Sequence, residues 1–381
     1  MKQGWEIKKL GEVCEVIGGS TPKTNEPTYW DGDFFWVTPA ELDGTKLISS
    51  TKRTITEAGI KSAHLQLLPA GTVLLSSRAP IGKVAITTVP MYCNQGFKNI
   101  ICSDKLYNCY VYWFLYAKTE YLNALGTGAT FKEISKKVVE QIPIPVPPLP
   151  VQERIVSELD LLSGIIEKKR EQLKEFDALA QSIFYDMFGD PITNEKGWEV
   201  KKLGEVAPAK EYKGEIPNKD GKYWLLNLDM VTAHTGEIIE QCYFEPNEIG
   251  NSTIVFNGEN VLYSKLRPYL NKVVLPKDIG FATSELVPLF PNKLQLDRMY
   301  LAHTLRSSSF VEYISAKVAG AKMPRVSMNE FRTFPIPLPP LPLQHQFASK
   351  IEAIERQKEL IKQSISETET LFNARMQEHF G

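Results

Sequence analysis

The segment Ile142-Pro-Ile-Pro-Val-Pro-Pro-Leu-Pro-Val-Gln152 decides the fold, because it recurs 192 residues later as Phe334-Pro-Ile-Pro-Leu-Pro-Pro-Leu-Pro-Leu-Gln344. Each copy leads into a long helical pattern, which ends at Phe188-Gly189 in the first copy and at Phe380-Gly381 in the second. Proline fixes φ and lacks an N–H donor, so neither run can form a helix interior or a central strand, although Pro150 suits the first turn of the helix that follows. We therefore expect a short, stiff, extended strut at each copy.

The helical patterns that follow the struts share one hydrophobic spacing and one register. A 3.5-residue period sustained over four heptads is typical of a coiled-coil seam, whereas two unrelated amphipathic helices would not need to match in register. The first seam contains Ile155, Leu159, Leu162, Ile166, Lys169, Leu173 and Phe176, and the second contains Phe347, Ile351, Ile354, Lys358, Ile361 and Ile365.

A pseudo-twofold axis between the repeats would let the two helices pair with each other. The second helix would then run back beside the first, and the two seams would bury one another as in a closed dimer. The stretch from Ile155 to Ile183 would measure about 42 Å at about 1.5 Å per residue. We expect a rod with one globular domain at each end.

The globular parts repeat as well. Trp5-Glu-Ile-Lys-Lys-Leu-Gly-Glu-Val13 returns as Trp198-Glu-Val-Lys-Lys-Leu-Gly-Glu-Val206. In the same way Gly128-Ala-Thr-Phe-Lys-Glu-Ile-Ser135 aligns with Gly320-Ala-Lys-Met-Pro-Arg-Val-Ser327. The edges of each half repeat closely and the interiors diverge, which indicates one scaffold that carries two different binding domains.

Each half combines short β-branched and aromatic runs between turn residues with helical stretches late in the half. The runs are at 34–37, 72–76, 84–88 and 261–264, and the helical stretches at 110–124 and 298–318. The predicted fold class is α+β, with two mostly antiparallel α+β domains related by a pseudo-twofold axis and separated by two long antiparallel coiled-coil helices. The predicted segments are domains at 1–149 and 190–341 and helices at 150–189 and 342–381.

The composition is that of an ordinary soluble protein, with 43% hydrophobic and 23% charged residues. The formal net charge of −1 excludes a uniformly basic coat, so any nucleic-acid surface must be a local patch. The five cysteines lack metal-ligand spacing, which indicates small buried side chains in a reducing cytosol. No apolar leader or long apolar run is found, and we expect a cytoplasmic protein without a membrane segment.

Catalytic motifs are missing from the sequence. It contains no GxxxxGK[ST] phosphate loop, no GxSxG elbow, no HExxH pair and no GxGxxG turn after a strand. The five histidines are scattered without ligand or triad spacing, and Glu167-Lys-Lys lies in a helical pattern without a companion acid. We expect no catalytic residue and no metal site in this chain.

Basic residues interleaved with hydroxyl, amide and aromatic residues occupy turn-rich loops in both halves. Arg and Lys can reach guanine edges or phosphates, and Asn and Gln can pair with adenine. Each is by itself more often a solvated loop residue, but the recurrence favours a nucleic-acid interface, above all at Arg78, Lys98, Lys265 and Arg267. The candidates are Thr21, Lys23, Thr24, Ser77, Arg78, Lys83, Asn94, Gln95 and Lys98 in the first half, and Tyr263, Lys265, Arg267, Tyr269, Lys272, Lys322 and Arg325 in the second.

Several motifs resemble those of type I restriction–modification specificity subunits. The stretch 18–39 (GGSTPKTNEPTYWDGDFFWVTP) is similar to the start of a target recognition domain. The stretches 126–145 and 179–204 and the Pro-Pro-Leu-Pro-x-Gln strut are also similar, so the resemblance covers the full length. The second domain departs from the opening motif, with Lys210-Glu-Tyr-Lys-Gly214 where the first has Gly18-Gly-Ser-Thr-Pro22.

The resemblance implies a division of labour between subunits. Each target recognition domain would read one half of a bipartite site in double-stranded DNA, and the helices would set the spacer and dock modification subunits, of which we expect two. Those subunits would bring S-adenosylmethionine and methylate adenine N6. Restriction subunits would bring ATP and Mg²⁺ for translocation and cleavage. The chain itself would bind no cofactor and would be non-catalytic alone.

The expected length of the rod agrees with two domains that each read one half of a bipartite DNA site. A length of about 40 Å slightly exceeds the separation of about 34–36 Å between half-sites of dimeric DNA readers. Two other functions remain open: a bivalent protein-binding scaffold without DNA recognition, and an autonomous nuclease or methyltransferase. Duplex binding that weakens steeply with salt would exclude the scaffold. Activity of the purified chain with Mg²⁺ or S-adenosylmethionine alone would indicate the enzyme.

Overall fold

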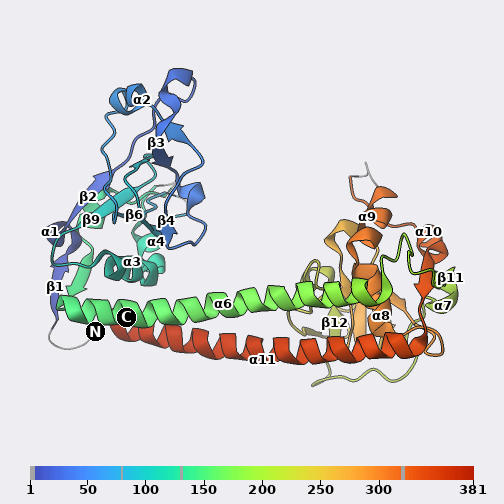
Figure 1. The fold of residues 1–381 in the computed structure, drawn as a ribbon. Helices are drawn as coiled ribbons and strands as arrows, with labels where there is room; N and C mark the ends of the chain where they lie inside the picture. Colours follow the sequence, from blue (N-terminus) through green and yellow to red (C-terminus); the bar gives the residue numbers. More distant parts are fainter. Residues whose placement is uncertain (1–4, 79, 129–131, 319–321) are drawn as a thin grey trace. The chain divides into compact units, whose positions relative to one another are not determined.

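The computed structural model describes residues 5–78, 80–128, 132–318 and 322–381, which form two compact units. Unit 1 comprises Met1–Arg170 and Gln363–Gly381, and unit 2 comprises Glu171–Lys362. Each unit combines an α+β globular part with segments of two long helices, α6 (Leu149–Phe188) and α11 (Leu341–Phe380) (Figure 1). Residues 129–131 and 319–321 of the aligned glycine motifs lie outside the described residues.

The described part of unit 1 contains three sheets. In the first, β1 (Glu6–Lys9) pairs antiparallel with β10 (Pro143–Val146), so the first proline run becomes an edge strand. The second sheet has the strand order β2-β9-β6-β7-β4 and the third has β5-β3-β8. The other strands are β2 (Cys14–Gly18), β3 (Trp30–Val37), β4 (Leu47–Ile48), β5 (Thr54–Ile55), β6 (Val73–Leu75), β7 (Val84–Thr87), β8 (Tyr92–Cys93) and β9 (Lys98–Cys102). The helices are α1 (Leu10–Val13), α2 (Glu57–Ser62), α3 (Asn108–Ala117), α4 (Thr119–Leu125) and α5 (Lys136–Glu140), with short 3-10 turns η1 (Pro27–Tyr29) and η2 (Pro39–Glu41).

Unit 2 repeats the strut and rearranges the sheets. Here β11 (Glu199–Lys202) pairs with β19 (Pro335–Leu338), the second proline run. The other sheets have the orders β13-β12-β17-β14 and β16-β15-β18. The strands are β12 (Tyr223–Leu226), β13 (Tyr243–Phe244), β14 (Thr253–Phe256), β15 (Val261–Ser264), β16 (Val273–Val274), β17 (Gly280–Thr283) and β18 (Leu286–Leu289). The helices are α7 (Leu203–Val206), α8 (Arg298–Arg306), α9 (Ser308–Ala316) and α10 (Met328–Thr333), with 3-10 turns η3 (Leu228–Met230) and η4 (Pro268–Leu270).

The late helical stretch of each half is interrupted once, which the sequence did not predict. In unit 1 the break between α3 and α4 falls at Lys118. In unit 2 the break falls at Ser307, whose hydroxyl oxygen accepts a hydrogen bond from the N–H of Phe310 at 3.3 Å. A serine at this position caps the next helix, so α9 begins anew and does not continue α8.

The two long helices pair antiparallel within each unit. In unit 1 the amino group of Lys169 donates to the hydroxyls of Ser364 and Thr368 at 2.6 and 3.0 Å. Glu158 Oε1 lies 2.8 Å from Arg375 Nε. Glu158 is nearer the start of α6 than Lys169, and Arg375 is nearer the end of α11 than Thr368. In unit 2 Lys358 binds Asp177 at 2.7 Å. The numbering rises along one helix as it falls along the other, as the pseudo-twofold model predicts (Figure 1).

The helix seam is most buried where it meets the globular parts. Phe380 and Met376 of α11 belong to the core of unit 1, and Phe184 and Phe188 of α6 belong to the core of unit 2. A buried side chain of this kind contributes about 1.5–3 kcal/mol to folding. Of the seam positions, Ile155, Leu159, Leu162, Ile166, Phe347, Ile351 and Ile354 are buried, whereas Leu173, Phe176, Ile361 and Ile365 are half-buried. Among the described helices, none is long and apolar enough to cross a membrane.

Candidate nucleic-acid interface

Three predicted residues of unit 1 meet around a carboxylate that the sequence analysis did not single out. Glu133 Oε2 lies 2.9 Å from Arg78 Nε, and its Oε1 lies 3.1 Å from Lys98 Nζ. Lys98 also donates to the hydroxyl of Ser77 at 3.2 Å. Burial alone would raise the pKa of Glu133, but the hydrogen bonds and charges of Lys98 and Arg78 outweigh it and hold that pKa below its usual value. The Glu133 carboxyl is therefore ionised at neutral pH.

Strand order brings this cluster together. Arg78 follows β6 and Lys98 begins β9, and these two strands are neighbours in the five-stranded sheet. The N–H of Ser77 donates to the carbonyl of Gly96 at 2.7 Å, and the N–H of Ile134 donates to the carbonyl of Ser77 at 3.0 Å. Backbone pairing on both sides of Ser77 fixes where Arg78 and Glu133 lie.

The loop that carries Thr21, Lys23 and Thr24 is held by two tryptophans. Trp36 Nε1 donates to the carbonyl of Ser20 at 3.2 Å, and Trp30 Nε1 donates to the carbonyl of Lys23 at 3.1 Å. Thr21 also hydrogen-bonds Gln95. The side chains of Lys23 and Thr24 remain exposed, so the loop is positioned by its backbone and leaves them available to a ligand.

Close backbone packing explains why glycine precedes this loop. A Cβ added to Gly19 would lie 2.0 Å from the carbonyl oxygen of Asn94. The Asn94 side chain in turn accepts from the N–H of Gly96 at 2.9 Å, so its amide oxygen serves the turn. This contact joins the 20–24 loop to the 94–98 turn that leads into Lys98.

Unit 2 places Arg267, Tyr269, Lys322 and Arg325 on its surface. Arg267 adopts a positive φ of 50°, and its N–H donates to the carbonyl of Pro324 at 2.8 Å. Tyr269 is 48% exposed. Arg325 pairs with both carboxylate oxygens of Glu285. Lys265 is half-buried, and its backbone pairs with Glu285 and Val326.

Four candidates have structural roles in this arrangement. Tyr263 is 3% exposed and stacks on Phe331 with ring centroids 4.4 Å apart, so its side chain cannot face a duplex. Ser77 is fully buried. The half-buried Lys83 and Lys272 donate from Nζ to the carbonyls of Leu42 and Leu228, at 2.8 and 2.6 Å. We therefore leave these four side chains out of the interface proposed below.

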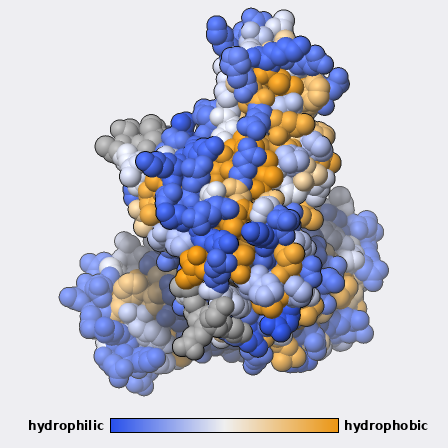
Figure 2. All heavy atoms as spheres, turned by 90° about the vertical axis from the view of Figure 1, so that its left-hand side faces the viewer, coloured by the Kyte–Doolittle hydropathy of each residue, from blue (hydrophilic) through white to orange (hydrophobic). Residues whose placement is uncertain are grey.

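The sequence did not predict the acidic partners Glu133 and Glu285 or the tryptophans Trp30 and Trp36 that hold the loop, because cations and amides are the residue types expected at phosphates and base edges. The alignment of the two glycine motifs already placed Glu133 opposite Arg325, and that reversal of charge is the signal that could have found Glu133. The face seen in Figure 2 mixes hydrophilic and hydrophobic residues.

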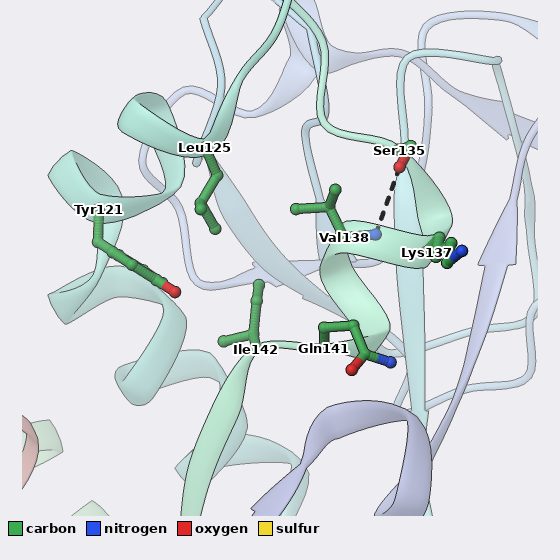
Figure 3. A pocket seen from close by; sticks show the side chains of 7 residues that line it. All are labelled: Tyr121, Leu125, Ser135, Lys137, Val138, Gln141 and Ile142. Carbon is green, nitrogen blue, oxygen red and sulfur yellow. Dashed lines mark hydrogen bonds between the residues drawn. The ribbon is translucent and has the colours of Figure 1, made fainter.

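One cavity in unit 1 lies outside this interface. The cavity in Figure 3, of about 290 Å³, is lined by Tyr121, Leu125, Ser135, Lys137, Val138, Gln141 and Ile142. These lining residues include no carboxylate, histidine or cysteine, and Ser135 already caps α5 by accepting from the N–H of Val138 at 3.3 Å. Nor do the described residues contain three or more His, Cys, Asp or Glu side chains grouped to hold a metal ion.

Comparisons with known proteins agree with the repeat. The model of the type I restriction modification DNA specificity domain matches twice, at residues 2–175 and 195–370. The MjaIX specificity subunit of a type I restriction enzyme from Methanocaldococcus jannaschii is 28% identical, over 92% of this chain and 86% of its own length. The EcoR124I/EcoR124II specificity subunit from Escherichia coli is 32% identical over 44% of this chain and 43% of its own. The crystal structure of the S subunit from M. genitalium has the same fold, with a TM-score of 0.58 at 13% identity over 100% of this chain and 98% of that one.

Proposed function

Because the chain belongs to the family defined by the type I restriction modification DNA specificity domain, we propose that it is the DNA sequence-specificity subunit of a type I restriction–modification complex. Each target recognition domain reads one half of a bipartite site in double-stranded DNA. The observation that carries this proposal is the double match to the domain, together with cationic loops that follow β6 in unit 1 and β15 in unit 2.

The proposed DNA interface consists of the candidates that keep an accessible side chain. The exposed candidates are Lys23, Thr24, Arg78 and Gln95 in unit 1 and Arg267, Tyr269, Lys322 and Arg325 in unit 2. Lysine and arginine at loop tips neutralise phosphates and fix the register of a protein on DNA, while base-edge contacts supply the sequence preference. Each wrong base pair costs about 1–3 kcal/mol, so two short half-sites give strong discrimination.

We further propose that the long helices set the spacer and dock two modification subunits. Leu179 of α6 and Leu371 of α11 occupy equivalent repeat positions, and both are 46% exposed. An exposed leucine at the same place in each repeat supports two equivalent docking surfaces. Leu179→Glu and Leu371→Glu should each remove one bound modification subunit in native mass spectrometry. Leu294→Glu, at an 84% exposed position outside the helices, is the control.

The chemistry is proposed to reside on those partners. The chain would bind no cofactor, and the modification subunits would hold S-adenosylmethionine. Restriction subunits would bring ATP and Mg²⁺. The complex would work in the cytoplasm, where its DNA substrate is found. Purified chain supplied with S-adenosylmethionine or Mg²⁺ alone should neither methylate nor cleave a duplex.

Salt-dependent DNA binding tests the proposal against a bivalent protein-binding scaffold. The affinity of the assembled complex for a duplex should fall steeply as the salt concentration rises. The reason is that lysine and arginine side chains release counterions from the DNA phosphates on binding, and added salt opposes this release. Arg267→Ala should weaken binding and reduce the salt slope by about one. Lys272→Met is the matched control, because Lys272 already binds the carbonyl of Leu228. If the complex shows no salt-dependent binding to a duplex, the scaffold without DNA recognition is supported instead.

A further inference from the structure

Glu133 and Arg325 occupy the same structural position in the two repeats. Residue 133 forms a bridge to Arg78, and residue 325 forms a bridge to Leu266. The residue that follows each one repeats the same bond: the N–H of Ile134 donates to Ser77 at 3.0 Å, and that of Val326 donates to Lys265 at 2.8 Å. The same backbone position therefore carries a carboxylate in unit 1 and a guanidinium in unit 2.

Each of these side chains lies among groups of the opposite charge and is still accessible. The side chain of Glu133 is 33% exposed between Arg78 and Lys98. That of Arg325 is 55% exposed beside Glu285. Arg78 uses Nε for Glu133, and within the described residues no hydrogen bond is found for its two terminal amino groups. The two positions thus combine donors and acceptors within reach of a ligand.

A carboxylate on a DNA-binding face has few acceptable partners. Phosphate oxygens repel it, and its oxygens can only accept, so on a duplex it suits the exocyclic amino group of cytosine, N4, or of adenine, N6. A guanidinium at the same place suits the O6 and N7 acceptors of guanine. A reversal of charge at one scaffold position therefore gives the two domains different base preferences with the same backbone.

We propose that Glu133 and Arg325 are specificity-determining residues that contact base edges, Glu133 accepting from an amino group of cytosine or adenine and Arg325 donating to guanine. This inference rests on the proposed function. Arg78 and Lys98 hold the Glu133 carboxylate in place when DNA is absent, and Glu285 holds Arg325. On binding, the carboxylate of Glu133 and the terminal amino groups of Arg325 turn to the bases.

The rival explanation is that both ion pairs only stabilise the loops. An ion pair of this exposure contributes little to stability. A purely stabilising pair would affect all DNA sequences equally, because removing it changes no base contact. A base-reading residue changes the preference at one position of one half-site.

The test is to determine the modified DNA motif in cells that express the chain with its modification subunits, and to measure the affinity of the purified complex for single-base variants of that motif. Glu133→Gln should reduce discrimination by about 5- to 150-fold at one position of the first half-site and leave the second half-site unchanged. Arg325→Lys keeps the charge but loses the planar fork, and should relax one position of the second half-site only.

Glu140→Gln is the matched control, because Glu140 is also 33% exposed and pairs with a lysine, Lys136, in the same unit. It should leave every base preference intact. If Glu133→Gln and Arg325→Lys change affinity equally for all sequences, or change nothing, the inference is wrong. If wild-type complex shows no sequence preference at all, the proposed function fails first. If Glu133→Gln lowers the thermal stability, the base preference of Arg325→Lys at the second half-site still tests the inference independently.

Discussion

Gln152 and Gln344 make the same three hydrogen bonds, each inside its own unit, and both are fully buried. The side-chain oxygen of Gln152 accepts from the N–H of Tyr107 at 2.9 Å, and its amide donates to the carbonyls of Lys105 and Pro147 at 2.9 and 2.8 Å. Gln344 repeats the set with Asp297, Gln295 and Pro339, at 2.8, 3.0 and 2.8 Å. The glutamine that ends each proline run thus ties the first turn of a long helix to the adjacent globular part.

Gln344→Ala should destabilise unit 2. The substitution leaves one N–H and two carbonyls buried without their partner, and each such group costs about 1–3 kcal/mol. Thermal unfolding should shift down by several degrees, since 1 kcal/mol corresponds to about 2–4 °C in a domain of this size. Gln172→Ala, at an exposed position of α6, should leave the midpoint unchanged. Equal midpoints for both variants would contradict a structural role for this glutamine.

Phe380→Ala should destabilise unit 1, although Phe380 is the second-last residue of the chain. Its side chain is 2% exposed, with ring centroids 5.4 Å from Tyr110 and 6.0 Å from Phe114 in α3. Truncating a buried phenylalanine costs about 3–5 kcal/mol. Hydrogen exchange should show reduced protection in α3. Leu371→Ala, at a 46% exposed position of α11, is the control, and unchanged protection in the Phe380 variant would show that the C-terminal turn is not part of this core.

The 3.5-residue hydrophobic period and the internal sequence repeat predicted the struts, the ends of the long helices and the antiparallel pairing of α6 and α11. These features depend on local backbone chemistry and on a regular hydrophobic seam. α6 and α11 end at Phe188 and Phe380, where the helical patterns in the sequence end. The strand orders were not predictable, since short strands pair with distant partners: β3 pairs in parallel with β8, whereas β6 pairs antiparallel with β7. Burial of individual loop residues depends on those pairings.

The candidate site shows the same limit. Arg78 and Arg267 are exposed, as an interface requires, but Lys83 and Lys272 use their amino groups to bind carbonyls, which no sequence pattern distinguishes. An amino group looks the same in a sequence whether it will face a duplex or a carbonyl of its own chain. Lysines that bind a carbonyl of their own chain recur in the repeat just as solvent-facing lysines do, so recurrence does not distinguish a structural lysine from a DNA-binding one.

Tyr263→Phe should keep both stability and DNA binding. The ring of Tyr263 lies in the core, where burial raises the pKa of its hydroxyl, and within the described residues no hydrogen-bond partner is found for that hydroxyl. Removing the hydroxyl therefore loses no bond, and the free energy of unfolding should stay equal or rise by about 1 kcal/mol. Tyr269→Ala, at an exposed position, should instead keep stability and weaken DNA binding. Loss of DNA binding in Tyr263→Phe would return Tyr263 to the interface.

His303 has an environment that requires a neutral ring. It stacks on Phe184 at 6.3 Å between ring centroids and meets Phe347 edge-on at 5.1 Å, although part of its surface stays exposed. Burial, and then the positive charges of Arg306 and Lys358, lower its pKa to about 3. An unfolded histidine has a pKa of about 6.5. The unfolded chain therefore binds the proton first.

Unit 2 should consequently lose stability in acid through this residue. The contribution of His303 is complete above about pH 6.5 and falls as the pH decreases toward 3, by at most about 1.4 kcal/mol per pH unit. In His303→Gln this part of the pH dependence should disappear, so urea unfolding at pH 7 and pH 5 should differ less than in the wild type. His345→Gln, at an exposed position of α11, should keep the wild-type profile. Parallel profiles for His303→Gln and the wild type would mean that water reaches the ring and stabilises its charged form, because only then would folding leave the proton affinity of His303 unchanged.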